Sequence, residues 1–563
     1  MKNNDILKGI LLILSAMAAV TVINPSWIYS PIGFVDGWVY LGHFLDPVAF
    51  WRTHPSHAAG DLLPHILPAA VLYQLLPPHL ANASFKLITY FGAALFLFLT
   101  AKREAGLKGA CFATVCFLFY RYFLMAAGTD YMDGRVVLYF SGALYCLSKS
   151  MEEEDGNILW MYCAGIFSSL SVFTSLLAAA YLPLLGIFYG GKMIHRRRLP
   201  SWKTISAFAG GAVSMAVLLS GIYWFYTGRV FFFGNSIRKA AGFLDMIKGN
   251  PFFPLKDLHW AALSIYMLVW GCAAFVMNRK ELRANALIFN FMNAAGLFTA
   301  WYLQYFKMQE TMTNSSYFGF FMPVVFLTLA VNVSPFCEKL TKLNFRVLLA
   351  CLFVLSALTF IADTKLCEPN DYFRGYLCIP ALAAWACVCA AAFGLRRQLP
   401  LAHLCACFFV IANFSPANSF MLYEKLGVSP YMPSRKQAFD YALGWSKLAR
   451  QADPDKSAYL WYNSAGGRDF FNDWAGVSHI WPGSVFNTLL PDTNAPITGA
   501  GVKQVGVLHE RDMILLVSGK EEADMAAVSL SRRGISLSCG LMAQLPLNVR
   551  AFYAYKCHAA PGQ

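Results

Sequence analysis

The chain has 563 residues, of which 57% are hydrophobic, 16% aromatic and only 13% charged, and its mean hydropathy is +0.48. Soluble globular proteins carry about 25% charged residues, so this composition excludes a soluble protein. The formal net charge is +14, and the positions of the basic residues decide what that charge means.

Apolar runs recur along the first three quarters of the chain. Most are about 17 to 25 residues long, which is enough to cross roughly 30 Å of hydrocarbon as a helix. This pattern predicts a multi-pass membrane protein with about thirteen transmembrane helices. The predicted spans cover residues 6–23, 85–100, 109–127, 135–149, 158–173, 175–191, 204–226, 259–277, 285–303, 317–334, 346–362, 372–393 and 402–421.

Basic residues set the predicted orientation, because cytoplasmic loops are enriched in Lys and Arg. With the N-terminus in the cytoplasm, short loops on that side contain the basic clusters at 102–108, 192–203, 279–283, 339–342 and 396–397. The net charge therefore reflects topology, and we expect no nucleic-acid partner. The predicted location is the cell (inner) membrane, with segments 24–84, 128–134, 227–258 and everything after about residue 422 on the extracytoplasmic, or periplasmic, face.

Residues 422–563 lack the long apolar runs of residues 1–421. This difference predicts a soluble domain on the outer face. Segments 458–462, 513–518 and 551–556 are typical of strands, and 520–533 is typical of a helix. Strands that alternate with a helix favour an α/β domain. The predicted fold class is therefore an all-α polytopic membrane domain followed by a C-terminal extracytoplasmic α/β domain.

Two of the fifteen cysteines, Cys539 and Cys557, fall in this outer domain. An oxidising compartment would permit a disulfide between them, and the sequence leaves their pairing open.

Asp36 follows the first predicted span, within the long first outer loop 24–84. A carboxylate there has two ordinary explanations, a solvated loop charge or a helix cap. A pure transporter or channel rarely has a first loop of this length, whereas an enzyme that works at the membrane surface needs one. The flanking Trp38 and Tyr40 suit a membrane interface or the face of a sugar.

A very short outer turn joins two predicted spans at Thr129-Asp130-Tyr131-Met132-Asp133-Gly134-Arg135. Ionisable groups held at the bilayer surface are functional candidates, so we predict a functional role for Asp130 and Asp133. The alternative is that one of the two carboxylates caps the N-terminus of the next helix.

Other polar groups lie on the predicted outer side. Arg229 belongs to segment 227–258, where five basic residues stand on the face that the topology rule disfavours. They indicate a bound anion such as a lipid phosphate or, alternatively, contact with lipid headgroups. Lys307 and Tyr317 belong to a polar outer edge that could line a cavity.

The spacing of His57, Asp61 and His65 would place all three on one face of a helix. A zinc site there stays open, although nearby prolines would make such a helix short or kinked. Histidines bonded to backbone or to lipid phosphate are commoner, and we predict no metal ligand.

Four segments share a pattern with a known family: Asp36-Gly37-Trp38-Val39-Tyr40, Leu62-Leu63-Pro64-His65-Ile66-Leu67-Pro68, Thr129-Asp130-Tyr131-Met132-Asp133-Gly134 and Ser316-Tyr317-Phe318-Gly319-Phe320-Phe321-Met322-Pro323. They resemble the first loop, the second acidic turn and a later block of the GT-C superfamily of membrane glycosyltransferases, in particular its bacterial family-39-like members. The superfamily includes the protein O-mannosyltransferases and the lipid A aminoarabinose transferases.

The resemblance implies an inverting transfer of a sugar from a polyprenyl-phosphate donor to an acceptor on the outer face. A base must then take the acceptor proton, and cations or donors must meet the leaving phosphate. We assign Asp36 as the base, Asp130 and Asp133 as positioning groups, and Arg135 and Arg229 to the phosphate.

The chain departs from the family in two places. The mannosyltransferases carry an Asp-Glu pair where this chain has Asp36-Gly37, and no basic residue stands near Leu62 or Leu63. Some members need a divalent metal and others do not. A lone Asp36 argues weakly against a metal, and no cofactor is certain.

Two other functions remain as alternatives. A lipid-linked oligosaccharide flippase or transporter would explain the spans but neither the outer domain nor the long first loop. An O-antigen polymerase or ligase tends to place its long outer loop late in the chain. The sugar and the acceptor, whether lipid, glycan or protein, stay open, and membrane lipid is an expected partner.

Overall fold

The computed structural model describes a set of segments that covers most of the first 365 residues and parts of the C-terminal region. They are residues 3–30, 35–53, 58–152, 157–238, 241, 264–265, 267–268, 284–303, 319–365, 434–440, 442–443, 457–462, 489–491, 511–517, 524, 527–528, 531, 535–546 and 551–561. The chain divides into two compact units. The first comprises Met1–Ile28, Asp61–His65 and Ala83–Tyr423, and the second comprises Tyr29–Gly60, Ile66–Asn82 and Glu424–Gln563.

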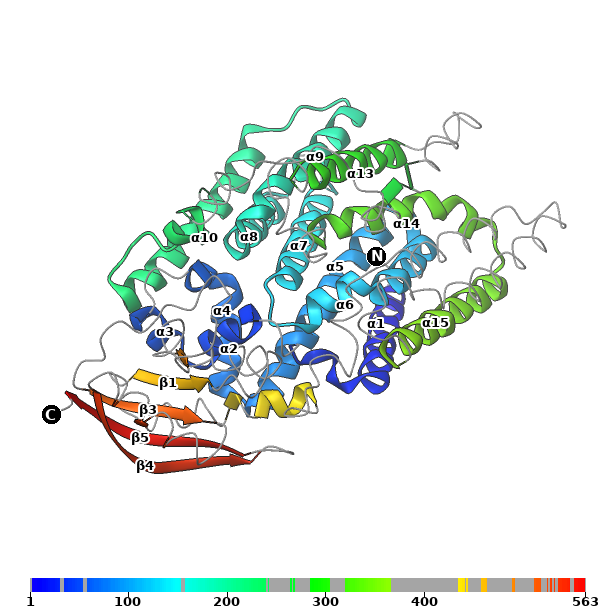
Figure 1. Cartoon of the computed structure of the whole chain (residues 1–563). Coiled ribbons are helices and arrows are strands. Elements are labelled where there is room, and N and C mark those ends of the chain that lie inside the picture. The colour runs from blue at the N-terminus through cyan, green and yellow to red at the C-terminus, as the bar shows by residue number, and fades with distance from the viewer. Residues whose placement is uncertain are drawn as a thin grey trace. The chain divides into compact units, whose positions relative to one another are not determined.

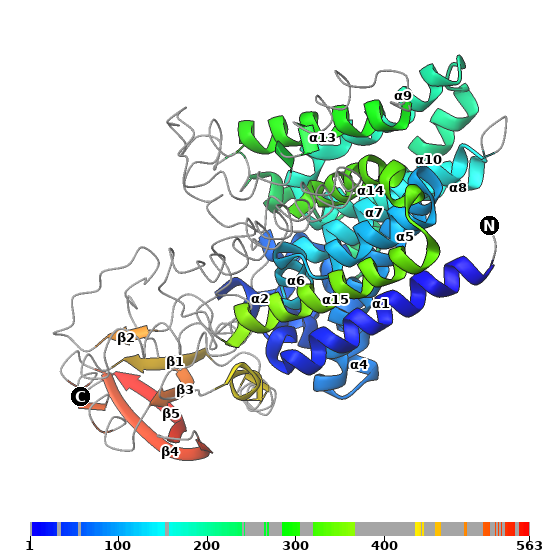
Figure 2. The same cartoon turned by 90° about the vertical axis from the view of Figure 1, so that its right-hand side faces the viewer.

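The first unit is a bundle of helices (Figure 1). In this bundle α7 packs against α8, α8 against α10, and α13 against both α9 and α14. Figure 2 shows α1 running beside α15, its neighbour in the bundle although the two are far apart in sequence. The helices are α1 (Asn3–Ile23), α6 (Arg121–Gly128), α7 (Asp133–Ser150), α8 (Ile158–Thr174), α9 (Leu182–His195), α10 (Trp202–Thr227), α13 (Ala284–Tyr302), α14 (Met322–Lys339) and α15 (Lys342–Lys365), with 3-10 turns η1 (Pro25–Ile28) and η3 (Leu176–Tyr181).

Three elements contribute residues to both units: the 3-10 turn η2 (Ala58–Asp61) and the helices α4 (Leu63–Leu75) and α5 (Pro78–Leu118). Proline occupies the first position of α5, where its missing N–H costs nothing and its fixed φ suits a helix. Gly106, with φ +78° and ψ 173°, breaks α5 into two helical stretches. This backbone conformation is one that glycine adopts readily and other residues rarely do.

Local chemistry explains where α8 and α10 begin and why they pack closely. Asn157 caps α8 by accepting from the backbone N–H groups of Leu159 and Trp160, and Ser201 caps α10. Where the two helices cross, a Cβ on Gly165 would lie 2.0 Å from the carbonyl oxygen of Phe208. Only a residue without a side chain permits this approach, as is common where membrane helices meet.

Helices long and apolar enough to cross a membrane occur four times among the described residues, at Asn4–Ile23, Pro78–Leu118, Leu176–His195 and Trp202–Thr227. On α10 the side chains of Val213, Val217 and Phe225 are 60 to 78% exposed, and such apolar exposure suits contact with lipid. The protein is therefore a membrane protein. The number of about thirteen spans stays a prediction, and the spans predicted at 372–393 and 402–421 lie outside the described residues.

One predicted span differs clearly from the structure. The run 109–127 was expected to form a single helix, but α5 ends at Leu118 and a separate α6 begins at Arg121. Tyr120 between them is extended, with φ −72° and ψ 122°. Arg121, directly after Tyr120, is the one charged residue in the predicted span 109–127 and the sign of the break in the sequence.

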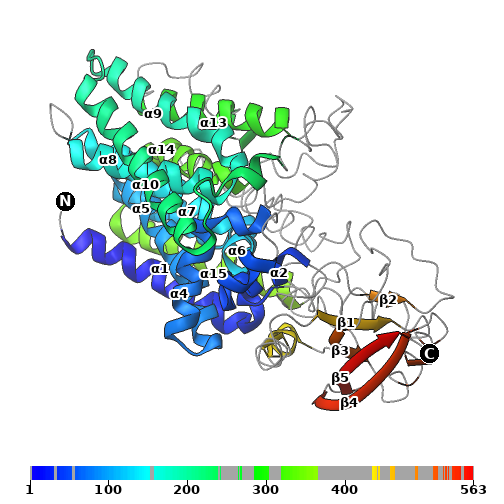
Figure 3. The same cartoon turned by 90° about the vertical axis from the view of Figure 1, so that its left-hand side faces the viewer.

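The second unit contains α2 (Val35–Leu45), α3 (Pro47–Thr53) and a sheet of five strands in the order β2-β1-β3-β5-β4. β1 (Ser457–Tyr462) pairs in parallel with β2 (Leu489–Pro491) and β3 (Arg511–Val517), whereas β5 (Ala551–Pro561) is antiparallel to both β3 and β4 (Ile535–Pro546). Figure 3 shows β4 and β5 as long curved neighbours.

The strands predicted at 458–462, 513–518 and 551–556 are confirmed as β1, β3 and β5, whereas β2 and β4 were not predicted. Cys539 and Cys557 face each other across β4 and β5 and form a disulfide. The predicted helix 520–533 lies mostly outside the described residues. The α/β class of this region and the domain boundary near residue 422 therefore stay predictions.

Candidate functional site

The candidate site lies in the first unit, around the turn between α6 and α7. Asp130 in this turn is 1% exposed, and its carboxylate accepts a hydrogen bond from the ammonium of Lys86, which is equally buried. This is a buried ion pair that joins α5 to the turn. Asp130 thus uses its carboxylate for a tertiary contact, and neither α6 nor α7 shows a side-chain cap bond at its N-terminus.

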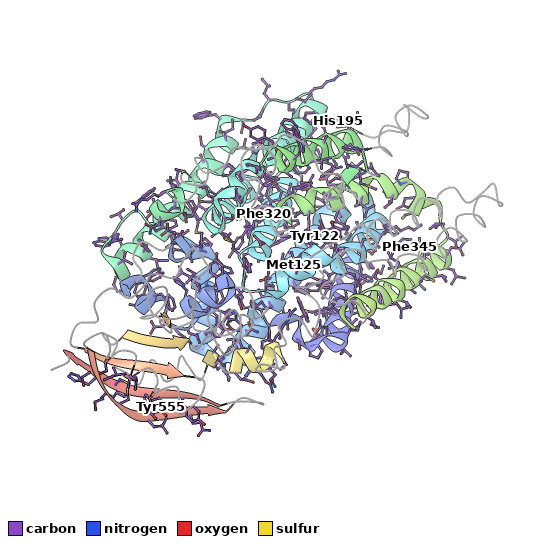
Figure 4. The ribbon with its side chains drawn as sticks, in the orientation of Figure 1. Tyr122, Met125, His195, Phe320, Phe345 and Tyr555 are labelled. Atoms are coloured by element: carbon purple, nitrogen blue, oxygen red, sulfur yellow. A yellow bond between two sulfur atoms is a disulfide. The ribbon has the colours of Figure 1, made fainter. Side chains whose placement is uncertain are left out.

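A glycine allows the turn to be this tight. A Cβ built on Gly134, the second residue of α7, would lie 2.4 Å from the carbonyl oxygen of Ala126 on α6. No L-residue with a side chain fits at that distance without displacing the backbone. Figure 4 labels Tyr122 and Met125 on α6, both of them buried residues that lead into the turn.

Arg135, in the first turn of α7, is buried against Phe85. Its Cζ lies 3.8 Å from the centre of the Phe85 ring, and its Nη2 donates to the Phe85 carbonyl oxygen at 3.2 Å. Within the described part of the chain its Nε has no hydrogen-bond partner and no carboxylate forms an ion pair with its guanidinium. A buried guanidinium that is incompletely bonded is costly, which makes Arg135 a candidate ligand for an anion.

The cationic groups of Arg135 and Lys86 both lie over Phe85, the ammonium of Lys86 at 5.4 Å from the ring centre. Two buried cations on one aromatic ring concentrate positive charge at the N-terminus of α7. Asp133, the first residue of α7, is fully buried there as well. A carboxylate at this position interacts favourably with the helix dipole.

The start of α4 is held against this turn by two hydrogen bonds. His65 Nε2 lies 2.8 Å from the Asp130 carbonyl oxygen. A carbonyl can only accept, so Nε2 carries the proton in this contact. Tyr139 on α7 donates to the Pro64 carbonyl oxygen at 2.9 Å. The turn is thus held at its backbone, through the Asp130 carbonyl oxygen, and at a side chain, through the Asp130 carboxylate.

Asp61 serves a different contact, so the expected shared helix face of His57, Asp61 and His65 is wrong. Asp61 ends η2, whereas His65 belongs to α4, and His57 lies outside the described residues. The Asp61 carboxylate accepts from the Asn235 side chain at 3.1 Å and from the Ser236 backbone N–H at 2.7 Å. Burial raises the pKa of Asp61 to about 6, although these hydrogen bonds oppose the shift.

The structure brings together Asp130, Asp133 and Arg135 of the predicted site and adds Lys86 and His65. Arg229 is exposed just beyond Gly228, the residue that ends α10. In the second unit, Asp36 is the second residue of α2, with its side chain outside the described part, and Trp38 and Tyr40 are buried. Lys307 and Tyr317 lie outside the described residues.

Lys86 is the functional candidate that sequence reasoning missed. It is a single ammonium at the start of the predicted span 85–100, and an ionisable residue at such a place is a functional candidate by itself. Across the segments that the structure describes, no three His, Cys, Asp or Glu side chains gather in a way that could hold a metal ion.

A solved structure of similar fold covers nearly the whole chain. A crystal structure of ArnT, a lipid A aminoarabinose transferase, from Cupriavidus metallidurans bound to undecaprenyl phosphate has a similar fold. It matches with a TM-score of 0.52 over 97% of each chain at 14% identity. At this identity the likeness establishes the fold alone. The resemblance predicted from the sequence motifs is confirmed at that level.

Two weaker likenesses carry no argument about this chain. ArnT from the same organism in the apo state matches with a TM-score of 0.49, at 14% identity and 97% coverage of both chains. The oligosaccharyltransferase of Archaeoglobus fulgidus in the apo form gives 0.45 at 11% identity, over 84% of this chain and 64% of that one. No protein-family model and no curated protein sequence matches the chain.

Proposed function

We propose that the protein is an inverting glycosyltransferase that moves a sugar from a polyprenyl-phosphate donor to an acceptor on the extracytoplasmic face of the membrane. The buried, incompletely bonded guanidinium of Arg135 beside the ammonium of Lys86 is the observation that carries this proposal. The fold supports it, because a protein of similar fold, ArnT, has been crystallised with undecaprenyl phosphate.

The donor phosphate is the group that these cations suit. Charge-assisted hydrogen bonds to phosphate are roughly twice as strong as neutral ones, and a guanidinium binds phosphate oxygens with two parallel N–H donors. A phosphate at Arg135 would complete the bonding that its Nε lacks within the described residues. Arg229 and the other outer cations of 227–258 are proposed to attract the same anionic headgroup from the lipid side.

In the proposed reaction Asp36 takes the proton of the acceptor hydroxyl while its oxygen attacks the anomeric carbon. The bond from that carbon to the phosphate oxygen breaks at the same time, and the electron pair leaves with the polyprenyl phosphate. Attack opposite to the leaving group inverts the anomeric centre. Cations at the leaving oxygen stabilise the charge that develops there.

The remaining candidates have supporting roles in this proposal. Asp130 holds Lys86 in place through the buried ion pair. The carboxylate of Asp133 balances the positive charge at the N-terminus of α7. Trp38, Tyr40, Lys307 and Tyr317 are proposed to shape the sugar site. Residues 1–421 would form the catalytic membrane domain, and residues 422–563 would shape or cover the acceptor site.

The experiment that tests this function incubates membranes containing the protein with a panel of radiolabelled undecaprenyl-phosphate sugars. We expect one label to move to lipid, glycan or protein in these membranes and not in membranes that lack the chain. Transfer from a nucleotide sugar alone, or movement of an intact lipid-linked sugar across the bilayer without transfer, would refute the proposal.

A further inference from the structure

A chain of hydrogen bonds joins three distant segments of the second unit. Tyr29 Oη lies 3.1 Å from His79 Nδ1, and His79 Nε2 lies 2.7 Å from Asp440 Oδ1. A carboxylate can only accept, so His79 donates from Nε2 and accepts the Tyr29 hydroxyl proton at Nδ1. Burial, followed by the charge of Asp440, raises the pKa of Tyr29, which keeps its hydroxyl a donor.

Aromatic packing holds the three side chains in this arrangement. The Phe439 ring, next to Asp440 in the sequence, lies 5.3 Å from the Tyr29 ring and 5.1 Å from the His79 ring. On the same helical segment, 435–440, the buried Arg435 donates to the Tyr29 carbonyl oxygen at 3.3 Å. Tyr29 is thus fixed at both its side chain and its backbone by the C-terminal region.

The residue after Tyr29 packs on the first turn of α2. Ser30 is buried, and a Cβ built on Gly37 would lie 3.2 Å from both Cβ and Oγ of Ser30. This contact leaves almost no space between the segment that Tyr29 anchors and the start of α2. Gly37 directly follows Asp36 in the sequence.

We propose that Tyr29, His79 and Asp440 are positioning residues that hold the start of α2, and with it Asp36, in the geometry needed for transfer. This inference rests on the proposed function, in which Asp36 is the base. Because Asp440 ends the hydrogen-bond chain, the C-terminal region would have a second role in addition to shaping or covering the acceptor site. A general base displaced by a fraction of an ångström to 1 Å loses much of its effect.

The variants should fold, since the side chains of His79 and Asp440 are 42% and 48% exposed and exposed ion pairs contribute little to stability. Tyr29→Phe removes only the hydroxyl and keeps both ring contacts. Asp440→Asn removes the charge at the other end of the chain. Asp524→Asn, at an exposed aspartate of the same region, is the matched control.

The first test measures kcat and the donor KM in membranes, with the radiolabelled undecaprenyl-phosphate sugar that the wild type turns over. Tyr29→Phe and Asp440→Asn should each lower kcat about tenfold with little change in donor KM. Because both act through His79, the double variant should lose no more than the worse single one. Losses of kcat that multiply in the double variant would overturn the proposal. Values of kcat equal to those of Asp524→Asn would overturn either the positioning or the role of Asp36 as the base, and a second test distinguishes the two.

A second test does not depend on activity. Ser30→Cys with Gly37→Cys places two Cβ atoms 3.2 Å apart, slightly closer than the roughly 3.5–4.5 Å of a disulfide. A shift of a few tenths of an ångström allows the bond, and mass spectrometry of the peptides measures its yield. The yield should be high in the wild-type background and several-fold lower with Tyr29→Phe. A disulfide yield that Tyr29→Phe leaves unchanged would show that the hydrogen-bond chain does not position the start of α2. A lower yield with unchanged kcat would instead place the failure in the assignment of Asp36 as the base.

Discussion

Lys86 and Arg135 share one aromatic ring but differ in their bonding. The ammonium of Lys86 is paired with Asp130, whereas the guanidinium of Arg135 has a backbone carbonyl as its polar partner among the described residues. Breaking a buried pair by removing one partner is strongly destabilising. Arg135 is therefore the better residue at which to test phosphate binding, because its removal leaves no paired carboxylate behind.

Arg135→Ala should raise the donor KM about tenfold or more, because one charge-assisted bond to phosphate contributes roughly 1.5–3 kcal/mol. The measurement is the dependence of transfer rate on donor concentration in membranes. Arg346→Ala, at an exposed arginine on α15, should leave it unchanged. An unaltered donor dependence in Arg135→Ala would remove this residue from the phosphate site.

Asp61 should make stability depend on pH in a defined direction. Burial raises its folded pKa to about 6 from an ordinary value of 3.8, so the folded state binds the proton first as pH falls. Its contribution to stability is therefore greatest below about pH 4 and is lost as pH rises through about 6. Asp61→Asn cannot titrate and should abolish this contribution.

The comparison is the thermal midpoint of the two purified proteins in detergent between about pH 4 and pH 7. The midpoint of the wild type, relative to that of Asp61→Asn, should rise on acidification. A difference between the two proteins that is independent of pH would show that Asp61 does not titrate in this range.

At the scale of elements, the contact of α6 with α7 sets the site. Gly134→Ala forces a Cβ against the Ala126 carbonyl, and overpacking of this kind costs about 1–3 kcal/mol. We expect a lower thermal midpoint and a transfer rate reduced more than in Gly186→Ala. Gly186 on α9 has no atom within 4 Å of a built Cβ. Equal behaviour of the two variants would contradict the close approach.

How far sequence predicted these elements depends on what decides each one. The spans 6–23 and 204–226 match α1 and α10 closely, because contact with hydrocarbon dictates their composition. The break at Tyr120 was missed because the apolar run continues on both sides of it and is interrupted by a single charged residue, Arg121. β4 contains Gly540 and ends at Pro546, residues that disfavour strands, so its pairing with β5 depends on tertiary contacts.

The site was predicted in part for a similar reason. Asp130, Asp133 and Arg135 stand out because charges at the end of an apolar run are rare. The pairing of Lys86 with Asp130 spans 44 positions and follows from how α5 meets the turn, which no local pattern specifies. His65 was considered as a zinc ligand, whereas it bonds to the Asp130 backbone.

For the whole molecule, the fold matches ArnT over 97% of both chains, and the predicted orientation can be tested directly. Alkaline phosphatase fused to the C-terminus should be active and a GFP fusion there should be dark, because the basic loops place that end outside. The same reporters inserted after Arg198, in a predicted cytoplasmic loop, should behave in the opposite way. The reverse result would put Asp36 in the cytoplasm.

Turnover by Asp36→Asn is the sharpest test of transfer from a lipid-phosphate donor with Asp36 as the base. Asn keeps the size of Asp but cannot take the proton, and positioned general bases contribute about 10²–10⁴-fold. The variant should therefore lose at least about a hundredfold in kcat while still inserting in the membrane and binding undecaprenyl phosphate. A kcat within a few-fold of the wild type would contradict the account and move the base to Asp133.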